Sequence, residues 1–246
     1  MSGDISVQPI CETSKGASTK IPTMRRIVQW TSAALRKDPD RFLQQVSGVI
    51  HVGANTGQER DLYQHHGLRV VWIEAIPEVF GTLLTNIQGY PNQVALQYLV
   101  TDQDGGEYAF HVSNNAGQSS SILELSLHRD IWPEVAYERT ITLRSTTLAS
   151  LLKRERINPS DYDALIMDTQ GSEYLVLKGA VPILPAFRFI KTEVPDFESY
   201  AGGCQVIDIE AFVSRHGFRE ISRNTIAQRA EGGSYYDIVY ERRAFA

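Results

Sequence analysis

A glycine-containing segment and a later acid are the residues of this sequence best suited to bind a ligand. The segment Gly53–Gly57 follows a short apolar run, Gly48–Val52, which is typical of a buried parallel strand. Glycines at such a junction permit a tight turn and let a ligand approach the backbone closely. Glu74 lies 21 residues beyond Gly53, where a carboxylate can accept hydrogen bonds from two ribose hydroxyls. The pair predicts a site for a nucleoside-containing ligand.

The spacing of the glycines discriminates between two kinds of such ligand. The pyrophosphate of a dinucleotide calls for G-x-G-x-x-G, but Asn55 occupies the place of the second glycine. An NAD(P)-binding oxidoreductase is therefore the alternative prediction. S-Adenosylmethionine has no phosphate and needs less clearance from the backbone, so Ala54 and Asn55 fit it better.

Two acids, Asp168 and Glu193, could take part in proton chemistry. Each ends a predicted strand, at 164–168 and at 187–193, and ligands of open α/β sheets bind outside the carboxyl ends of the strands. We expect Asp168 to be the general base or the residue that orients a hydroxyl, with Glu193 second. Their structural alternatives are a helix cap for Asp168 and an ion pair for Glu193. Together they could bind Mg²⁺ or Mn²⁺, but two carboxylates do not specify a metal site.

His111 is a third candidate base. It lies on or beside a polar loop, residues 114–121, and could act if that loop closes over a substrate. The alternative is an exposed histidine without a role in catalysis. Four aromatic residues could line an acceptor pocket, although burial in the core is the commoner fate of such residues: Trp30, Phe42, Trp132 and Tyr200.

Alternating strands and helices must position these residues. Strands are predicted at 48–52, 68–74, 94–100, 164–168, 187–193, 218–223 and 235–242, and helices at 58–66, from Pro77, from Leu148, at 173–178 with Gly179 closing it, and at 206–216. The last two strands are joined so closely that they must be antiparallel. Residues 101–145 are predicted to be a β insertion that carries a mobile loop. The pattern predicts a doubly wound α/β sheet of seven strands.

The N-terminal 46 residues are predicted to be an arm and a helical cap, with helices from Thr23 and over 41–46, ahead of one domain at 47–246. The cap could cover the active site or form a homodimer face.

The composition of the chain limits the kinds of partner that it is expected to bind. With 24 Lys and Arg against 29 Asp and Glu, the formal charge of −5 gives no broad attraction for nucleic acid. No apolar run is long enough to cross a membrane, and two cysteines are too few for a disulfide framework. We expect a cytoplasmic protein that acts on a small molecule.

Five blocks of this sequence resemble the FkbM family of S-adenosylmethionine-dependent methyltransferases. The order and spacing of the blocks carry the resemblance: Val52–Gly57, Glu74–Pro77, Asp168–Glu173, Val176–Ala180 and Lys191–Val194. The resemblance implies a class I methyltransferase fold. It also implies O-methylation of a hydroxyl on a sugar or another natural-product small molecule.

The resemblance extends to the cofactor site. The loop after the first strand would hold the methionine part of the cofactor, and Glu74 would hold the ribose. Class I enzymes usually place an acid or amide against the adenine after the third strand, where this chain has Thr101 and Asp102; a turn residue is the alternative for Asp102. The predicted cofactor-binding residues are His51, Gly53, Ala54, Asn55, Thr56, Gly57, Glu74, Ala75, Thr101, Asp102 and Asp168.

At two positions the chain departs from this family. Members usually have an acid where this chain has His51, and a second acid where it has Gln170. Gln170 can form hydrogen bonds but cannot act as a base, so any catalytic role of that acid is lost or moved here. We expect His51 to be a hydrogen-bonded residue beside the cofactor. The departures leave a third hypothesis, a protein that binds the cofactor without turnover.

Overall fold

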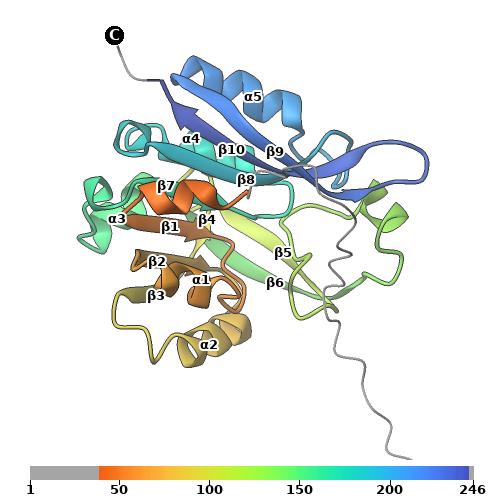
Figure 1. The fold of residues 1–246 in the computed structure, drawn as a ribbon. Coiled ribbons are helices and arrows are strands. Elements are labelled where there is room, and N and C mark those ends of the chain that lie inside the picture. Colours follow the sequence, from red (N-terminus) through yellow and green to blue (C-terminus); the bar gives the residue numbers. More distant parts are fainter. Residues whose placement is uncertain (1–38, 244–246) are drawn as a thin grey trace, which may run out of the picture. The chain divides into compact units, whose positions relative to one another are not determined.

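Short runs of β-branched and aliphatic residues form the central strands of this fold. The computed structural model describes residues 39–243 (Figure 1). The strands are β1 (Gly48–Val52), β2 (Arg69–Glu74), β3 (Gln93–Gln97), β4 (Leu99–Val100), β5 (Glu107–Ser113), β6 (Tyr137–Thr146), β7 (Ala164–Met167), β8 (Phe189–Pro195), β9 (Phe218–Gln228) and β10 (Ser234–Arg242). The α-helices are α1 (Arg60–His65), α2 (Pro77–Asn86), α3 (Leu148–Arg154), α4 (Glu173–Ala180) and α5 (Val206–Arg215). Four 3₁₀ turns join them: η1 (Arg41–Gln45), η2 (Leu127–Asp130), η3 (Pro159–Asp161) and η4 (Leu184–Ala186).

Seven of the strands form one sheet in the order β3-β2-β1-β7-β8-β10-β9. The β10 strand is antiparallel to both of its neighbours, whereas the pairs from β3 to β8 are all parallel. This confirms the predicted doubly wound sheet with an antiparallel last strand. The order also places the carboxyl ends of β1, β2 and β7 side by side, where the candidate residues of all three strands can meet.

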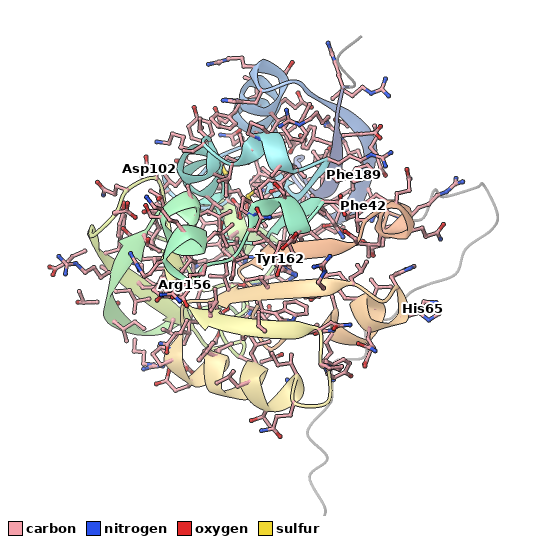
Figure 2. All side chains as sticks on the ribbon, turned by 90° about the vertical axis from the view of Figure 1, so that its left-hand side faces the viewer. Phe42, His65, Asp102, Arg156, Tyr162 and Phe189 are labelled. Carbon is pink, nitrogen blue, oxygen red and sulfur yellow. The ribbon has the colours of Figure 1, made fainter. Side chains whose placement is uncertain are left out.

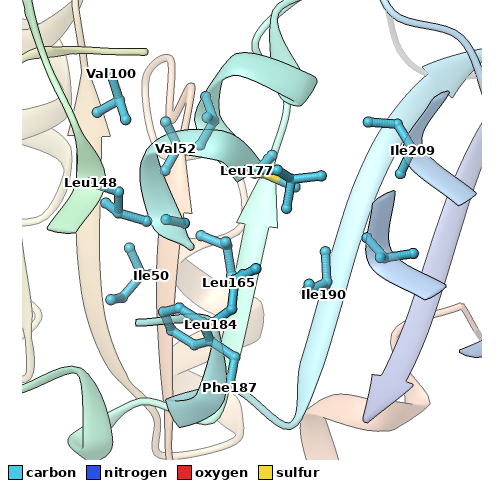
Figure 3. Close-up of a cluster of buried hydrophobic side chains, with 14 of the residues drawn as sticks. Ile50, Val52, Val100, Leu148, Leu165, Leu177, Leu184, Phe187, Ile190 and Ile209 are labelled. Atoms are coloured by element: carbon cyan, nitrogen blue, oxygen red, sulfur yellow. The ribbon is translucent and has the colours of Figure 1, made fainter. Parts of the chain in front are cut away.

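Two hydrophobic layers, one on each face of the large sheet, bury its strands. Helices α3, α4 and α5 pack on one face, and Figure 3 shows side chains of this layer, with Ile50 and Leu165 from strands and Leu177 and Ile209 from helices. On the other face, η1, α1 and α2 supply residues such as Phe42, Tyr63 and Leu83. All five residues of β1 are buried, because a central parallel strand is covered from both sides.

A second, three-stranded sheet forms the β insertion in the order β4-β6-β5. The β4 strand pairs in parallel with β6, and β5 pairs with β6 antiparallel. The third predicted strand, 94–100, is therefore divided: its first part pairs with β2, and after Tyr98 the chain joins the second sheet. Apolar character alone did not distinguish one strand from two short strands in different sheets.

Two predicted helix boundaries lie two residues from the observed ones. The first helix begins at Arg60 instead of residue 58, so two residues, Gln58 and Glu59, separate it from Gly57 at the end of the glycine loop. Gly179 does not close the fourth helix, which continues to Ala180. A Cβ atom at Gly179 would lie 2.2 Å from the Thr101 carbonyl oxygen, so this glycine allows the helix to pack closely against the chain after β4.

Of the predicted N-terminal cap, the structure describes the last turn. The helix predicted from Thr23, and with it Trp30, lies outside the described residues. The helix predicted at 41–46 is a 3₁₀ turn, η1. Its Phe42 ring packs against Phe189 of β8 with ring centroids 5.5 Å apart (Figure 2). Thus Phe42 belongs to the core of the sheet.

Candidate functional site

The glycine loop turns at the carboxyl end of β1 and is held from both neighbouring strands. Gly53 has φ +79°, and a Cβ there would lie 1.9 Å from the carbonyl oxygen of Asp168. The amides of Gly53 and Ala54 both donate to the Ile73 carbonyl, at 2.9 and 3.0 Å. The loop continues through Asn55, which has φ +45°. Only glycine fits the first position, because both the conformation and the contact with β7 exclude a side chain.

Glu74, the predicted ribose acid, is bound to this loop. One carboxylate oxygen accepts the amide of Asn55 and the other the amide of Ile76, each at 2.8 Å. The residue is 6% exposed. Burial raises its pKa to about 7, against the lowering effect of the backbone donors. The predicted pair of loop and acid is therefore a single hydrogen-bonded unit.

The chain after β4 holds the residues predicted to contact adenine. Thr101 is fully buried, and Asp102 forms an ion pair with Lys178 of α4, with 2.5 Å between Oδ2 and Nζ. The Asp104 carboxylate binds the start of α3, where it accepts from Thr147 N at 2.7 Å and from Ser150 Oγ at 2.7 Å. The ion pair limits the freedom of Asp102, and its contact with adenine stays a prediction.

Asp168 directly follows β7 and heads a row of acids that crosses three strands. The residue before it, Met167, pairs with Thr192, so Asp168 neighbours Glu193; Glu193 in turn pairs with Asp237 of β10. Burial, and next the charge of Glu173, raises the pKa of Asp168 to about 7. Burial, and next the charge of Asp168, raises the pKa of Glu193 well above its ordinary value. Groups with raised pKa values next to one another are suited to accept or hold protons near neutral pH.

Gln170 supplies the polar contact that the Asp168 side chain makes. Its amide nitrogen donates to Asp168 Oδ1 at 2.5 Å. Its own φ is +54°, an unusual value for a residue with a Cβ. Glu173 has a structural role instead, because its carboxylate accepts from the amides of Thr169 at 2.7 Å and Gly171 at 3.0 Å. Cys204 Sγ donates to the same carboxylate at 3.2 Å.

Polar loop 114–121 is packed, with Ser119, Ser120 and Ser121 all buried. At one end the Asn55 side chain donates to the Ala116 carbonyl at 3.1 Å. At the other end Ser121 Oγ donates to the Gln170 carbonyl at 2.8 Å. The loop thus joins the glycine loop to the turn after β7. The sequence predicts a mobile loop that could close over a substrate; in the structure this loop is packed and bonded at both ends.

Both candidate histidines are engaged with aromatic residues. His51 Nδ1 lies 3.1 Å from the Tyr63 hydroxyl, and its ring stacks on Trp72 at 5.1 Å. Burial lowers the pKa of His51. A hydrogen-bonded residue was predicted there, and its contact with the cofactor stays a prediction.

His111 lies in β5, where its ring stacks on Tyr137 at 4.8 Å and Nδ1 lies 3.0 Å from Thr140 Oγ1. Glu124 Oε1 lies 3.3 Å from its Nε2. These contacts place the imidazole within the insertion, and its role as a base stays a prediction.

Within residues 39–243, no three or more His, Cys, Asp or Glu side chains are grouped so that they could hold a metal ion. No helix in the same part of the chain is long and apolar enough to cross a membrane.

The strand order, the one antiparallel strand and a glycine loop joined to an acid at the end of β2 together define the fold of a class I methyltransferase. The sequence of residues 51–220 matches the family model described as Methyltransferase FkbM domain. That match covers more than two thirds of the chain, so this protein belongs to the FkbM methyltransferase family. The family predicted from the five sequence blocks is confirmed.

Several solved structures are similar to this chain at low sequence identity. An uncharacterized protein from Listeria monocytogenes serotype 4b and M. capricolum TrmK, in complex with S-adenosyl-homocysteine, each have 8% identity and a TM-score of 0.46 over 81% of this chain. The chain spans 63% of the length of each. An O-methyltransferase from Bacillus cereus in complex with S-adenosylhomocysteine has 13% identity and a TM-score of 0.43, over 82% of this chain and 79% of that one. No curated protein is significantly similar in sequence.

Proposed function

We propose that this protein binds S-adenosylmethionine at the glycine loop and methylates a hydroxyl group of a small molecule, a sugar or a related natural product. One observation carries the proposal: Asp168 is in contact with the cofactor loop, because the Asp168 carbonyl occupies the space that a Cβ at Gly53 would fill. The candidate base and the candidate cofactor loop are therefore adjacent.

The residues present fit this cofactor. Gly53 lets the loop turn tightly against the chain after β7. The Glu74 carboxylate has oxygen lone pairs left for ribose hydroxyls after accepting two amides. Asn55, in the place of a second glycine, is compatible with a nucleoside that lacks phosphate. When bound, the cofactor supplies an electrophilic methyl group.

Asp168 is the group that we propose to take the proton of the acceptor hydroxyl. A base works best when its pKa lies near the working pH, and that of Asp168 is raised to about 7. Burial, and next the like charge of Asp168, raises the pKa of Glu193, which lies beside it, and disfavours ionisation of both acids at the same time. In the first proton-transfer step, Asp168 is therefore the carboxylate and Glu193 the neutral acid.

The charges around Asp168 favour a small acceptor over nucleic acid. The row of Asp168, Glu193 and Asp237 contains carboxyl groups only, so it offers no cation to bind a phosphate group. Lys191, the nearest cation of β8, is already paired with Asp40 at 2.8 Å and Asp237 at 3.5 Å. A neutral or amine-bearing acceptor suits such a surface.

The experiment is transfer of a labelled methyl group from S-adenosylmethionine to a panel of monosaccharides, polyols and phenols. Asp168→Asn keeps the shape of the side chain and the acceptor atom for Gln170 but removes the base, so we expect turnover to fall by about 10²- to 10⁴-fold with cofactor binding retained. Asp161→Asn, at an exposed acid of η3, is the matched control. Undiminished turnover in Asp168→Asn would refute the assigned base, and cofactor binding without transfer to any acceptor would favour the non-catalytic alternative.

A further inference from the structure

Tyr200 is connected to the candidate base through one side chain. Its hydroxyl donates to Gln170 Oε1 at 2.6 Å, and Gln170 Nε2 donates to Asp168 Oδ1 at 2.5 Å. Tyr200 itself is 1% exposed and packs against Gly171, where a Cβ would lie 3.1 Å from its ring. The three residues form a chain of donors that begins in the core and ends on Asp168.

Gln170 is held in place from several sides. Its backbone carbonyl accepts from Ser121 Oγ at 2.8 Å, its side-chain oxygen accepts from Tyr200, and its backbone is left-handed at φ +54°. A residue with a Cβ keeps such a backbone only where its surroundings enforce it. These contacts hold the amide group in place. What can still vary is whether its nitrogen or its oxygen faces Asp168.

We propose that Tyr200 is a positioning residue: by donating to Gln170 Oε1 it turns the amide so that the N–H group faces the Asp168 carboxylate. This inference rests on the proposed function, in which Asp168 takes a proton from the acceptor. A reversed amide would place its oxygen against the carboxylate, and two acceptors would face each other. The tyrosine hydroxyl makes the productive orientation the better one.

The same chain accommodates the proton once Asp168 has received it. A protonated Asp168 can donate to the amide oxygen if the amide reverses, which turns the amide N–H group towards Tyr200. The hydroxyl then accepts that bond and can donate to the Ser119 carbonyl, which lies 3.3 Å away. Each protonation state of Asp168 thus has a fully bonded arrangement, and neither requires a backbone movement.

The groups around Asp168 explain why its carboxylate needs the donor that Tyr200 and Gln170 provide. Burial raises its pKa most, and the charges of Glu173 of α4, Asp237 of β10 and Glu59 before α1 raise it further. Glu193 of β8 is its ionisable neighbour across the sheet. The hydrogen bond from Gln170 lowers the pKa of Asp168, because a hydrogen bond to the charged form favours that form. A glutamate at position 170, as in the family pattern, would add a like charge at this point.

The test is a pH titration of the Asp168 carboxyl carbon by NMR in the full-length protein without cofactor. In Tyr200→Phe we expect the titration midpoint of Asp168 to rise by about 0.5 to 1 pH unit, because the amide loses its preferred orientation. Tyr235→Phe is the matched control: it removes the hydroxyl of another buried tyrosine of this region, which bonds Ser199 and not Gln170, and should move the midpoint by less than about 0.2.

The wild-type protein offers a second readout if Tyr200→Phe does not fold. The side-chain amide resonances of Gln170 should change over the pH range in which Asp168 titrates. Three results would each overturn the inference. They are an unchanged Asp168 midpoint in folded Tyr200→Phe, an equal shift in Tyr235→Phe, and Gln170 resonances that do not change as Asp168 titrates. None of these measurements needs the cofactor, so they are independent of whether the protein proves to be a methyltransferase.

Discussion

Two acids at the carboxyl ends of strands, Glu74 and Asp168, have pKa values near 7, and burial is the main cause for both. Sequence spacing was enough to find them, because each follows an apolar run that had to be a buried strand. What the sequence could not supply were their partners. Gln170 was noticed only as a departure from the family, and Tyr200 only as an aromatic residue. The contact between them joins residues that are far apart in the chain and depends on the folded turn after β7.

The raised pKa of Glu74 predicts how stability depends on pH. Its pKa of about 7 in the folded protein exceeds the ordinary 4.5, so the native state binds this proton more tightly than the unfolded chain. The stabilisation is complete below about pH 4.5 and is lost as the pH rises towards 7. In Glu74→Gln we expect the free energy of unfolding to fall less between pH 5 and 8, by up to about 3 kcal/mol.

Denaturant unfolding at several pH values measures this difference. Glu231→Gln changes an exposed acid in the loop between β9 and β10 and should follow the wild-type profile. Profiles of equal slope for Glu74→Gln and the wild type would show that Glu74 is not a buried, proton-binding group.

At the scale of elements, the alternation of strands and helices was predictable because each has its own apolar period. The predicted elements differ from the observed ones at places where tertiary contacts determine the backbone conformation. The third strand divides because its end pairs with β6, and the loop at 114–121 is packed because Asn55 and Gln170 bind it. The end of α4 was predicted at Gly179 because glycine commonly ends helices. Here, the same glycine serves a close approach between two elements.

Two helix glycines should therefore respond in opposite ways to alanine. Gly81→Ala in α2 meets no atom within 4 Å, so it should stabilise the protein by about 0.5 to 1 kcal/mol through helix propensity alone. Gly179→Ala in α4 places a Cβ 2.2 Å from the Thr101 carbonyl and should destabilise it by about 1 to 3 kcal/mol. Urea unfolding gives both values. A stabilised Gly179→Ala would contradict the close packing of α4 on this segment.

At the scale of the molecule, the large sheet brings the glycine loop, Glu74 and Asp168 to one edge, and the insertion places loop 114–121 across it. The sequence predicted that these residues meet, because they follow strands in a fixed order. It could not predict how side chains of the insertion and of β8 and β10 meet beside them. Our central claim is that S-adenosylmethionine binds at this edge.

Calorimetric titration of the full-length protein with S-adenosylhomocysteine tests that claim most directly. We expect saturable binding to the wild type and to Gly67→Ala, which has a similar left-handed backbone at φ +67° but no atom within 4 Å of an added Cβ. In Gly53→Ala the Cβ collides with Asp168, so binding should be at least about tenfold weaker, a difference of about 1.4 kcal/mol. Heat from NAD(P) but not from S-adenosylhomocysteine, or equal binding to Gly53→Ala and the wild type, would contradict the account.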